Sequence, residues 1–162
     1  MDFTSPSTYY TGITGIIERI TPMNSQCCNQ IISLRSQNGT VNFVLSPGTY
    51  VTDNTLLRTR MRITAFYDAN LPVPLIYPPQ YQAAFIGRTE PGENIMIDYF
   101  DTNLVSANNS LRLAVDPSTR VSTANGQQFT CDLGNHLLMV YYSFITRSAP
   151  SQTTPERIIV FC

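Results

Sequence analysis

Short runs of alternating apolar and polar residues fill most of the chain, and Pro, Gly, Asn and Ser separate these runs. Met61, Ile63, Ala65 and Tyr67 illustrate the alternation within residues 60–68. A period of two is typical of a β-strand that buries one face. No segment of ordinary helix length shows a helical period. The pattern therefore predicts an all-β fold.

Two sets of strands are expected, one in each half of the chain. The first set covers residues 10–20, 31–35, 40–45, 60–68 and 81–86. The second covers residues 94–100, 103–105, 111–115, 137–144 and 158–161. Between the second and third strands of the first set stands Asn38-Gly39, and an Asn-Gly pair between apolar alternations predicts a β-hairpin.

The two halves repeat each other. Residues 61–86 and 137–161 each read as an apolar strand ending in Tyr, a Pro-interrupted crossing and a second apolar strand. Upstream, residues 46–51 and 116–121 both read x-Pro-x-Thr-x-Val. The alignment places Tyr67 on Tyr142, Pro74 on Pro150, Pro79 on Pro155 and Phe85 on Phe161. A repeat of this kind indicates two tandem copies of one small β unit.

Each copy is expected to be an OB-like small β-barrel or sandwich. Five strands, a first strand in which Gly12 and Gly15 permit strong bending, and a long link before the fourth strand are the pattern of that fold. The expected organisation is an N-terminal arm at 1–9, a first unit at 10–88 and a second unit at 89–162.

Charge is scarce in this sequence. Charged residues make up 13% of the chain, against about 25% in an ordinary soluble domain. All ten basic residues are Arg, and the net charge is −1. Because Lys on surfaces and sheet edges normally prevents association, a chain without Lys is expected to have a surface that meets other protein.

The chain carries no apolar run of the length that spans a membrane, and its first residues lack the features of a signal peptide. We therefore expect synthesis in the cytoplasm, no export signal and no membrane partner. Four cysteines fit uneasily with this expectation, because they would be reduced in the cytosol. Release of the protein by cell lysis, or removal of a propeptide, would reconcile these two features.

The cysteines are the main candidates for covalent chemistry. Cys27 and Cys28 are adjacent, Cys131 is expected in a loop, and Cys162 is the last residue. Spacing alone leaves open whether they are unpaired thiols or partners in disulfides within or between chains. A zinc site is disfavoured because the paired Cys-x-x-Cys spacing of structural zinc sites is missing.

Catalysis, cofactor binding and metal binding have little support. Cys131 and His136 form the only conceivable nucleophile and base, and no oxyanion-hole signature surrounds them. Asp98 and Asp101 lack the spacing of a calcium loop. We therefore expect a protein that is not an enzyme and that has no catalytic, cofactor or metal site.

An alternative is a binding face, because OB-like barrels hold ligands on aromatic platforms. Its candidate residues are Arg58, Arg60, Arg62, Tyr67, Tyr77 and Tyr81. Nucleic acid is the disfavoured ligand, since the chain is net acidic and backbone neutralisation drives such binding. A peptide or a glycan remains open.

A Lys-free, Asn/Gln/Thr-rich β protein with Cys27-Cys28 and a terminal Cys162 resembles the subunits of bacterial endospore appendages and other robust extracellular fibres. The resemblance implies a structural subunit that assembles head to tail into a filament, is stabilised by inter-subunit disulfides, and ends on the spore surface or outside the cell. In such an assembly, we expect the arm at 1–9 to add to a neighbour's sheet edge, because backbone hydrogen bonds give affinity in strand addition. The alternative is a non-catalytic double OB-like binding module.

Overall fold

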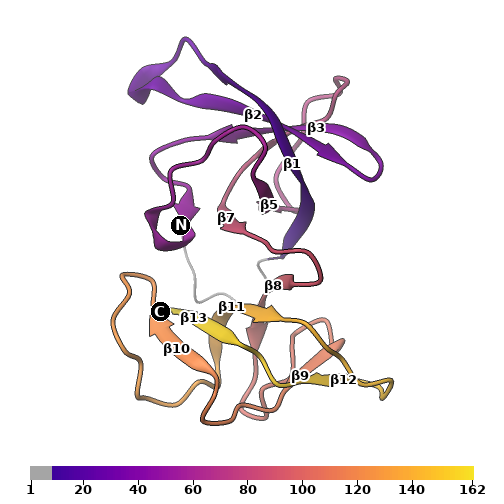
Figure 1. Ribbon diagram of the computed structural model, residues 1–162, viewed down its shortest axis with the longest axis vertical. Coiled ribbons are helices and arrows are strands. Elements are labelled where there is room, and N and C mark those ends of the chain that lie inside the picture. The colour runs from indigo at the N-terminus through magenta and orange to yellow at the C-terminus, as the bar shows by residue number, and fades with distance from the viewer. Residues whose placement is uncertain (1–8) are drawn as a thin grey trace. The chain divides into compact units, whose positions relative to one another are not determined.

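The computed structural model describes residues 9–162, and this part of the chain is all-β, as predicted (Figure 1). Its helical structure is limited to two single 3-10 turns, η1 (Gln26–Cys28) and η2 (Thr52–Asn54). The chain divides into two compact units after Glu90, two residues from the boundary expected from the sequence. Apart from Tyr9, the predicted N-terminal arm at 1–9 lies outside the described residues.

The first unit contains seven strands. They are β1 (Tyr10–Pro22), β2 (Gln30–Ser36), β3 (Gly39–Leu45), β4 (Tyr50–Val51), β5 (Arg62–Asp68), β6 (Gln80–Gln82) and β7 (Phe85–Arg88). Their order in the sheet is β4-β7-β5-β1-β2-β3-β6.

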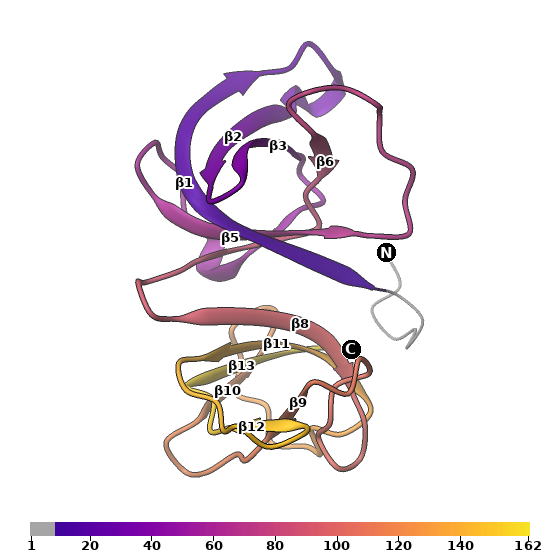
Figure 2. The ribbon, with the colours of Figure 1, turned by 90° about the vertical axis from the view of Figure 1, so that its right-hand side faces the viewer.

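The long strand β1 pairs with two neighbours in turn. Its first half is antiparallel to β5 and its second half is antiparallel to β2, with a register shift between Ile17 and Arg19. Close contact at the bend requires Gly15, because a Cβ there would lie 2.5 Å from the carbonyl oxygen of Arg35. Figure 2 shows β1 as a strongly curved strand.

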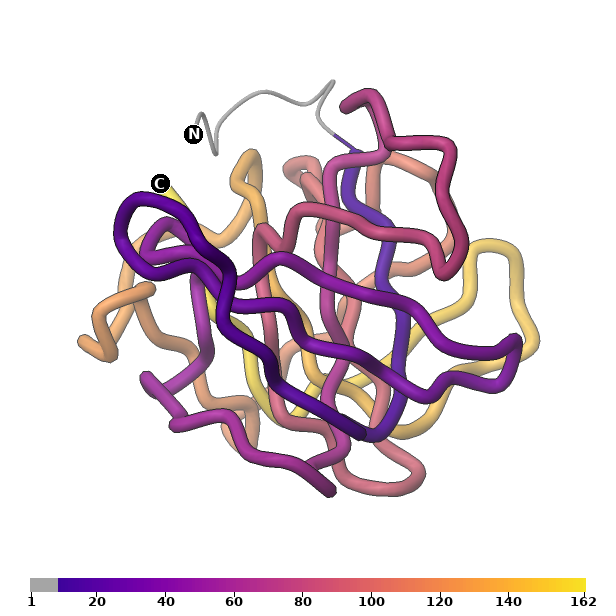
Figure 3. The backbone as a smooth tube through the Cα atoms, turned by 90° about the horizontal axis from the view of Figure 1, so that it is seen from above, coloured from indigo at the N-terminus to yellow at the C-terminus, as the bar shows by residue number. Residues whose placement is uncertain are grey.

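The hairpin predicted at Asn38-Gly39 is confirmed. Ser36 pairs with Gly39, and Gly39 has a φ of 110°, a conformation that favours glycine. Figure 3 traces the chain from β1 through a wide loop into β2 and back through this tight turn into β3.

Residues 80–88 join the two ends of the first sheet. Strand β6 is parallel to β3, and strand β7 is antiparallel to β5. The Ala83 N–H donates to the Val44 carbonyl at 3.0 Å, and the next N–H, of Ala84, donates to the Phe66 carbonyl at 2.8 Å. The chain thus crosses from β3 to β5. The core of the first unit contains Ile17, Ile32, Leu34, Val41, Phe43, Ile63, Ala65, Ala83 and Ile86.

The second unit contains β8 (Asn94–Phe100), β9 (Leu111–Leu113), β10 (Arg120–Thr123), β11 (His136–Tyr142), β12 (Ser151–Thr153) and β13 (Arg157–Phe161). Strand β11 is antiparallel to β8 and β13, and two parallel pairs, β10 with β13 and β9 with β12, complete the pairing. Its core contains Phe100, Leu111, Leu113, Leu138, Val140, Ile158 and Val160.

The two x-Pro-x-Thr-x-Val segments make the same hydrogen bonds, each within its own unit. The Thr49 hydroxyl donates to the Ala83 carbonyl at 2.8 Å, and the Thr119 hydroxyl donates to the Pro155 carbonyl at 2.8 Å. One residue further on, the N–H of Tyr50 donates to Ala84 and that of Arg120 donates to Glu156, both at 3.0 Å. These paired contacts give a residue-by-residue match between the units.

The match supports one part of the sequence alignment and corrects another. Phe66 accepts a hydrogen bond from Ala84, and Tyr141 accepts one from Glu156, so Tyr67 and Tyr142 each follow the residue that accepts this bond. The counterpart of Pro155, however, is Ala83.

Counting back five residues from Pro155 and from Ala83 places Pro150 on Pro78, and not on Pro74. Phe85 pairs with Tyr50, whereas Arg157 pairs with Arg120. Phe85 therefore corresponds to Arg157 and not to Phe161. The alignment matched residue types in the last strand, whereas strand pairing decides the register.

Candidate functional site

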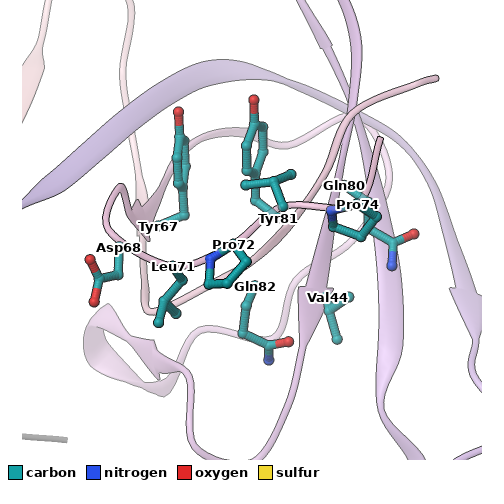
Figure 4. A pocket seen from close by; sticks show the side chains of 10 residues that line it. Val44, Tyr67, Asp68, Leu71, Pro72, Pro74, Gln80, Tyr81 and Gln82 are labelled. Carbon is teal, nitrogen blue, oxygen red and sulfur yellow. The ribbon is translucent and has the colours of Figure 1, made fainter. Parts of the chain in front are cut away.

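A pocket in the first unit lies beside the end of β5, at strand β6 and the loop of residues 69–79 (Figure 4). Its volume is about 180 Å³. This space is smaller than the several hundred Å³ of most small-molecule sites. The lining residues are Val44, Tyr67, Asp68, Leu71, Pro72, Val73, Pro74, Gln80, Tyr81 and Gln82.

Two tyrosines form the aromatic part of this pocket. The rings of Tyr67 and Tyr81 are stacked, with centroids 3.9 Å apart and planes 12° from parallel. Both rings also contact the fully buried Phe43, at 6.3 and 5.8 Å between centroids. Figure 4 shows the two hydroxyls pointing the same way. The pair packs against the core of the first unit and also lines the pocket.

The tyrosine pair also has a shared electrostatic environment. Partial burial, followed by the charge and hydroxyl of Tyr81, raises the pKa of Tyr67, while a hydrogen bond with Thr11 opposes the shift. Tyr67 is therefore neutral at physiological pH.

The remaining polar groups of the lining are the side chains of Asp68, Gln80 and Gln82, with no basic residue among them. One carboxylate oxygen of Asp68 accepts the Asn70 N–H at 2.9 Å. Ring faces, amides and one carboxylate are groups that would hold a ligand by contact and hydrogen bonding.

Exposed apolar side chains concentrate in two loops at corresponding positions. The loop 69–79 follows β5, and the loop 143–150 follows β11, the counterpart of β5. Seven of the ten large apolar side chains exposed among residues 9–162 lie in these loops: Leu71, Val73, Leu75, Ile76, Tyr77, Phe144 and Ile145. Leu75 is completely exposed, and Phe144 is 85% exposed. We call residues 69–79 and 143–150 the two apolar loops.

The structure brings together some residues of the predicted binding face and separates others. Tyr67 and Tyr81 are in contact, and Tyr77 lies in the adjoining loop and is 84% exposed. Arg58 and Arg60 precede β5, and Arg62 begins it. Arg62 is about 17 Å along the strand from Tyr67 and, by strand alternation, on its opposite face. The arginines therefore do not flank the tyrosine pair.

All four cysteines are free and exposed. Cys27 and Cys28 form the turn η1 between β1 and β2, and both have positive φ, 61° and 50°. Cys131 lies in the loop before β11, and Cys162 follows β13. No disulfide joins them within the part of the chain that is described, so the predicted cross-links between molecules stay a prediction.

The remaining candidate residues have structural hydrogen bonds. His136 begins β11, its Nδ1 lies 3.1 Å from the Leu133 carbonyl, and its ring meets Phe129 edge-on. Burial raises the pKa of Asp98, which accepts the N–H groups of Tyr99 and Asn108. Asp101 accepts two backbone N–H groups of its own loop. Within residues 9–162, no group of three or more His, Cys, Asp or Glu side chains is arranged to hold a metal ion.

No family model matches the chain, and no curated protein sequence is similar enough to count as a relative. Among the described residues, no helix is long and apolar enough to cross a membrane.

Sequence reasoning missed the two apolar loops. Residues 71–77 read Leu-Pro-Val-Pro-Leu-Ile-Tyr, a pattern that predicts only a Pro-interrupted crossing. The available signal was the pairing of prolines with large apolar residues. Proline prevents regular strand pairing, so apolar residues beside it have no sheet face on which to be buried.

Proposed function

We propose that the chain is a structural, self-assembling subunit built from two OB-like β units in tandem. The matched turns and the equivalent strand pairs support the internal repeat. In the first unit, a parallel contact between β3 and β6 and the crossing at Ala83-Ala84 give five strand paths in a closed ring. That arrangement supports an OB-like barrel.

The observation that carries self-assembly is the pair of apolar loops. Solvent-exposed apolar side chains gathered in one place mark interaction surfaces, whereas scattered ones do not. Here each unit has its own exposed group, including Leu75 and Phe144. A subunit with two attachment points can be extended at both, and head-to-tail contacts that do not close produce a filament.

Charge and cysteines support the same proposal. Charged residues make up 13% of the chain, and the ion pair of Arg35 with Glu18 joins two well-exposed side chains. A surface with so few charges has little to oppose association. The exposed thiols on both units are available for cross-links between neighbours. We propose an extracellular or spore-surface fibre as the setting, since oxidising surroundings would allow such cross-links.

The test replaces apolar side chains in one loop or the other. Sedimentation velocity over a range of concentrations, with negative-stain electron microscopy at the highest, would follow assembly. We expect the parent protein to form filaments. Leu75→Ser with Ile76→Ser, and Phe144→Ser with Ile145→Ser, should each weaken association at least tenfold, because each removes two contacts worth about 1.5–3 kcal/mol when fully buried.

Leu56→Ser is the matched control. Leu56 is 70% exposed but lies outside both loops, so its replacement should leave assembly unchanged. A parent protein that remains monomeric at millimolar concentration would contradict the proposal. Loop variants that assemble as readily as the parent would contradict the role of the loops.

A binding module is the second candidate function, and the pocket beside Tyr67 and Tyr81 is the observation that favours it. In this alternative, a non-catalytic double OB-like protein holds a peptide, a glycan or a single strand of nucleic acid. The lining has one carboxylate and no basic group, which disfavours a phosphate-bearing ligand. Ligand-dependent shifts in the spectrum of a monomeric protein would favour this function over assembly.

A further inference from the structure

In the second unit, the chain itself covers one edge of β12. Ser151 and Thr153 make backbone hydrogen bonds with residues next to β9, so the backbone of Gln152 between them points to the other side. There the Gln152 carbonyl accepts the Thr146 N–H at 2.9 Å, and its N–H donates to the Thr146 hydroxyl at 2.8 Å. The hydroxyl of Thr153 donates to the Phe144 carbonyl. Residues 144–146 therefore occupy this edge.

The corresponding edge in the first unit belongs to β6. Ala83 and Pro155 accept equivalent hydrogen bonds from Thr49 and Thr119, and counting back three residues matches Gln80 with Gln152. The Asn42 N–H donates to the Pro79 carbonyl at 2.8 Å. In a parallel ladder this contact directs the N–H and C=O of Gln80 away from β3, as those of Gln152 are directed away from β9.

No chain segment within residues 9–162 covers the Gln80 edge. Strand β6 ends its sheet, with β3 as its one strand partner. The loop 69–79 turns back on itself, with the Leu71 N–H bonded to Asp68 and the Ile76 N–H bonded to Pro74. The space beside Gln80 is the pocket, and Tyr67 and Asp68 form its opposite wall. The first unit thus has a pocket at the edge that the second unit fills with its own chain.

We propose that the Gln80 edge binds an extended polypeptide segment from another molecule, in the way that residues 144–146 lie along β12. Backbone hydrogen bonds to Gln80 would supply affinity, as in other cases of strand addition. The stacked tyrosines and the prolines of the loop would contact its side chains. The segment would lack acidic residues, because Asp68 is the one charged residue in the lining. This site goes beyond self-assembly and does not depend on it.

Two observations favour a peptide over the other ligands of the binding-module alternative. The second unit provides a peptide occupant at the matching edge, with its hydrogen bonds in place. The volume of about 180 Å³ is also small for a nucleotide or an oligosaccharide, whereas an extended chain needs room for only one or two side chains at a time.

The experiment uses the ¹⁵N-labelled full chain and a capped synthetic peptide with the sequence of residues 143–148, Ser-Phe-Ile-Thr-Arg-Ser. Amide shifts of residues 67–68 and 80–82 should move on titration and yield a dissociation constant. A peptide N-methylated at its Thr should bind about tenfold more weakly, since it loses the N–H that Gln80 accepts and gains a clash. N-methylation at its Ile, whose N–H points away from the edge, is the matched control and should leave affinity unchanged.

A protein variant provides the reciprocal test. Gln80→Pro removes the N–H that faces the pocket without removing a bond to β3, and it should weaken peptide binding by a similar factor while the rest of the spectrum is retained. Unmoved amides at 80–82 with millimolar peptide, or equal binding of both N-methylated peptides, would overturn the proposal. So would shifts at these amides with oligothymidylate or a maltooligosaccharide, if the peptide gives none.

Discussion

Tyr67 and Tyr81 show how one pair of side chains serves the core and the surface together. Their rings pack on the fully buried Phe43, which accounts for part of their burial. Their hydroxyls interact with each other, and both side chains also line the pocket. At the corresponding positions, the second unit has Tyr142 and Thr153 and therefore no stacked pair. The aromatic wall is a property of the first unit alone.

The first prediction concerns the pKa of Tyr67. In Tyr81→Phe, the pKa of Tyr67 should fall toward its ordinary value of 10 but remain above it, because burial is the largest cause of the shift and survives the substitution. Carbon-13 NMR titration of the tyrosine Cζ resonances would measure the change. Tyr142 is the internal control, since burial alone raises its pKa.

The raised pKa of Tyr67 also makes the stability of the fold depend on pH. The unfolded chain releases the Tyr67 proton near pH 10, before the folded protein does, so the contribution of Tyr67 to stability is fully present below pH 10 and is lost as the pH rises through its folded pKa. Urea denaturation between pH 9 and 11 should show a smaller loss in Tyr81→Phe than in the parent. An unchanged Tyr67 titration in that variant would contradict the assigned coupling.

At the scale of elements, the two x-Pro-x-Thr-x-Val turns should contribute equally to the stability of their units. Thr49→Val and Thr119→Val keep the shape of the side chain but leave the Ala83 or Pro155 carbonyl without its donor. Each substitution should cost about 1–2 kcal/mol in the free energy of unfolding, measured by urea denaturation.

Thr59→Val is the control for this pair, because Thr59 is exposed and lies outside both turns. Its replacement should change the free energy of unfolding by no more than about 0.5 kcal/mol. A large loss for one turn variant and none for the other would contradict the equivalence of the two turns.

Particular elements also show how far the sequence alone leads. The hairpin at Asn38-Gly39 was predictable, and both Pro-x-Thr segments make the same hydrogen bonds, because a turn depends on a few local residues. The last strand was misaligned, since Phe161 resembles Phe85 in type but not in pairing. The pocket was not predictable, because it depends on where residues 69–79 lie relative to β6. That relation is set by long-range packing.

At the scale of the whole molecule, the four thiols connect composition to assembly. All are exposed and none is paired within the described residues, and they are distributed over both units. In a reduced and dilute sample, four equivalents per chain should react with a thiol reagent such as Ellman's reagent without denaturant. The exposure of all four thiols favours this outcome, because a thiol must be accessible to react with the reagent.

Concentration should then distinguish thiols at subunit contacts from those that face solvent. If the chain assembles, alkylation with mass-spectrometric mapping should find one or more of Cys27, Cys28, Cys131 and Cys162 protected at high concentration and reactive after dilution. The same cysteines should form the intermolecular disulfides on air oxidation, because a contact holds two thiols near each other at the short separation a disulfide requires. Filaments in which all four thiols stay equally reactive would show that the cysteines lie away from the contacts. That result would remove covalent locking from the proposed assembly, whereas fewer than four reactive thiols in the dilute protein would contradict their exposure.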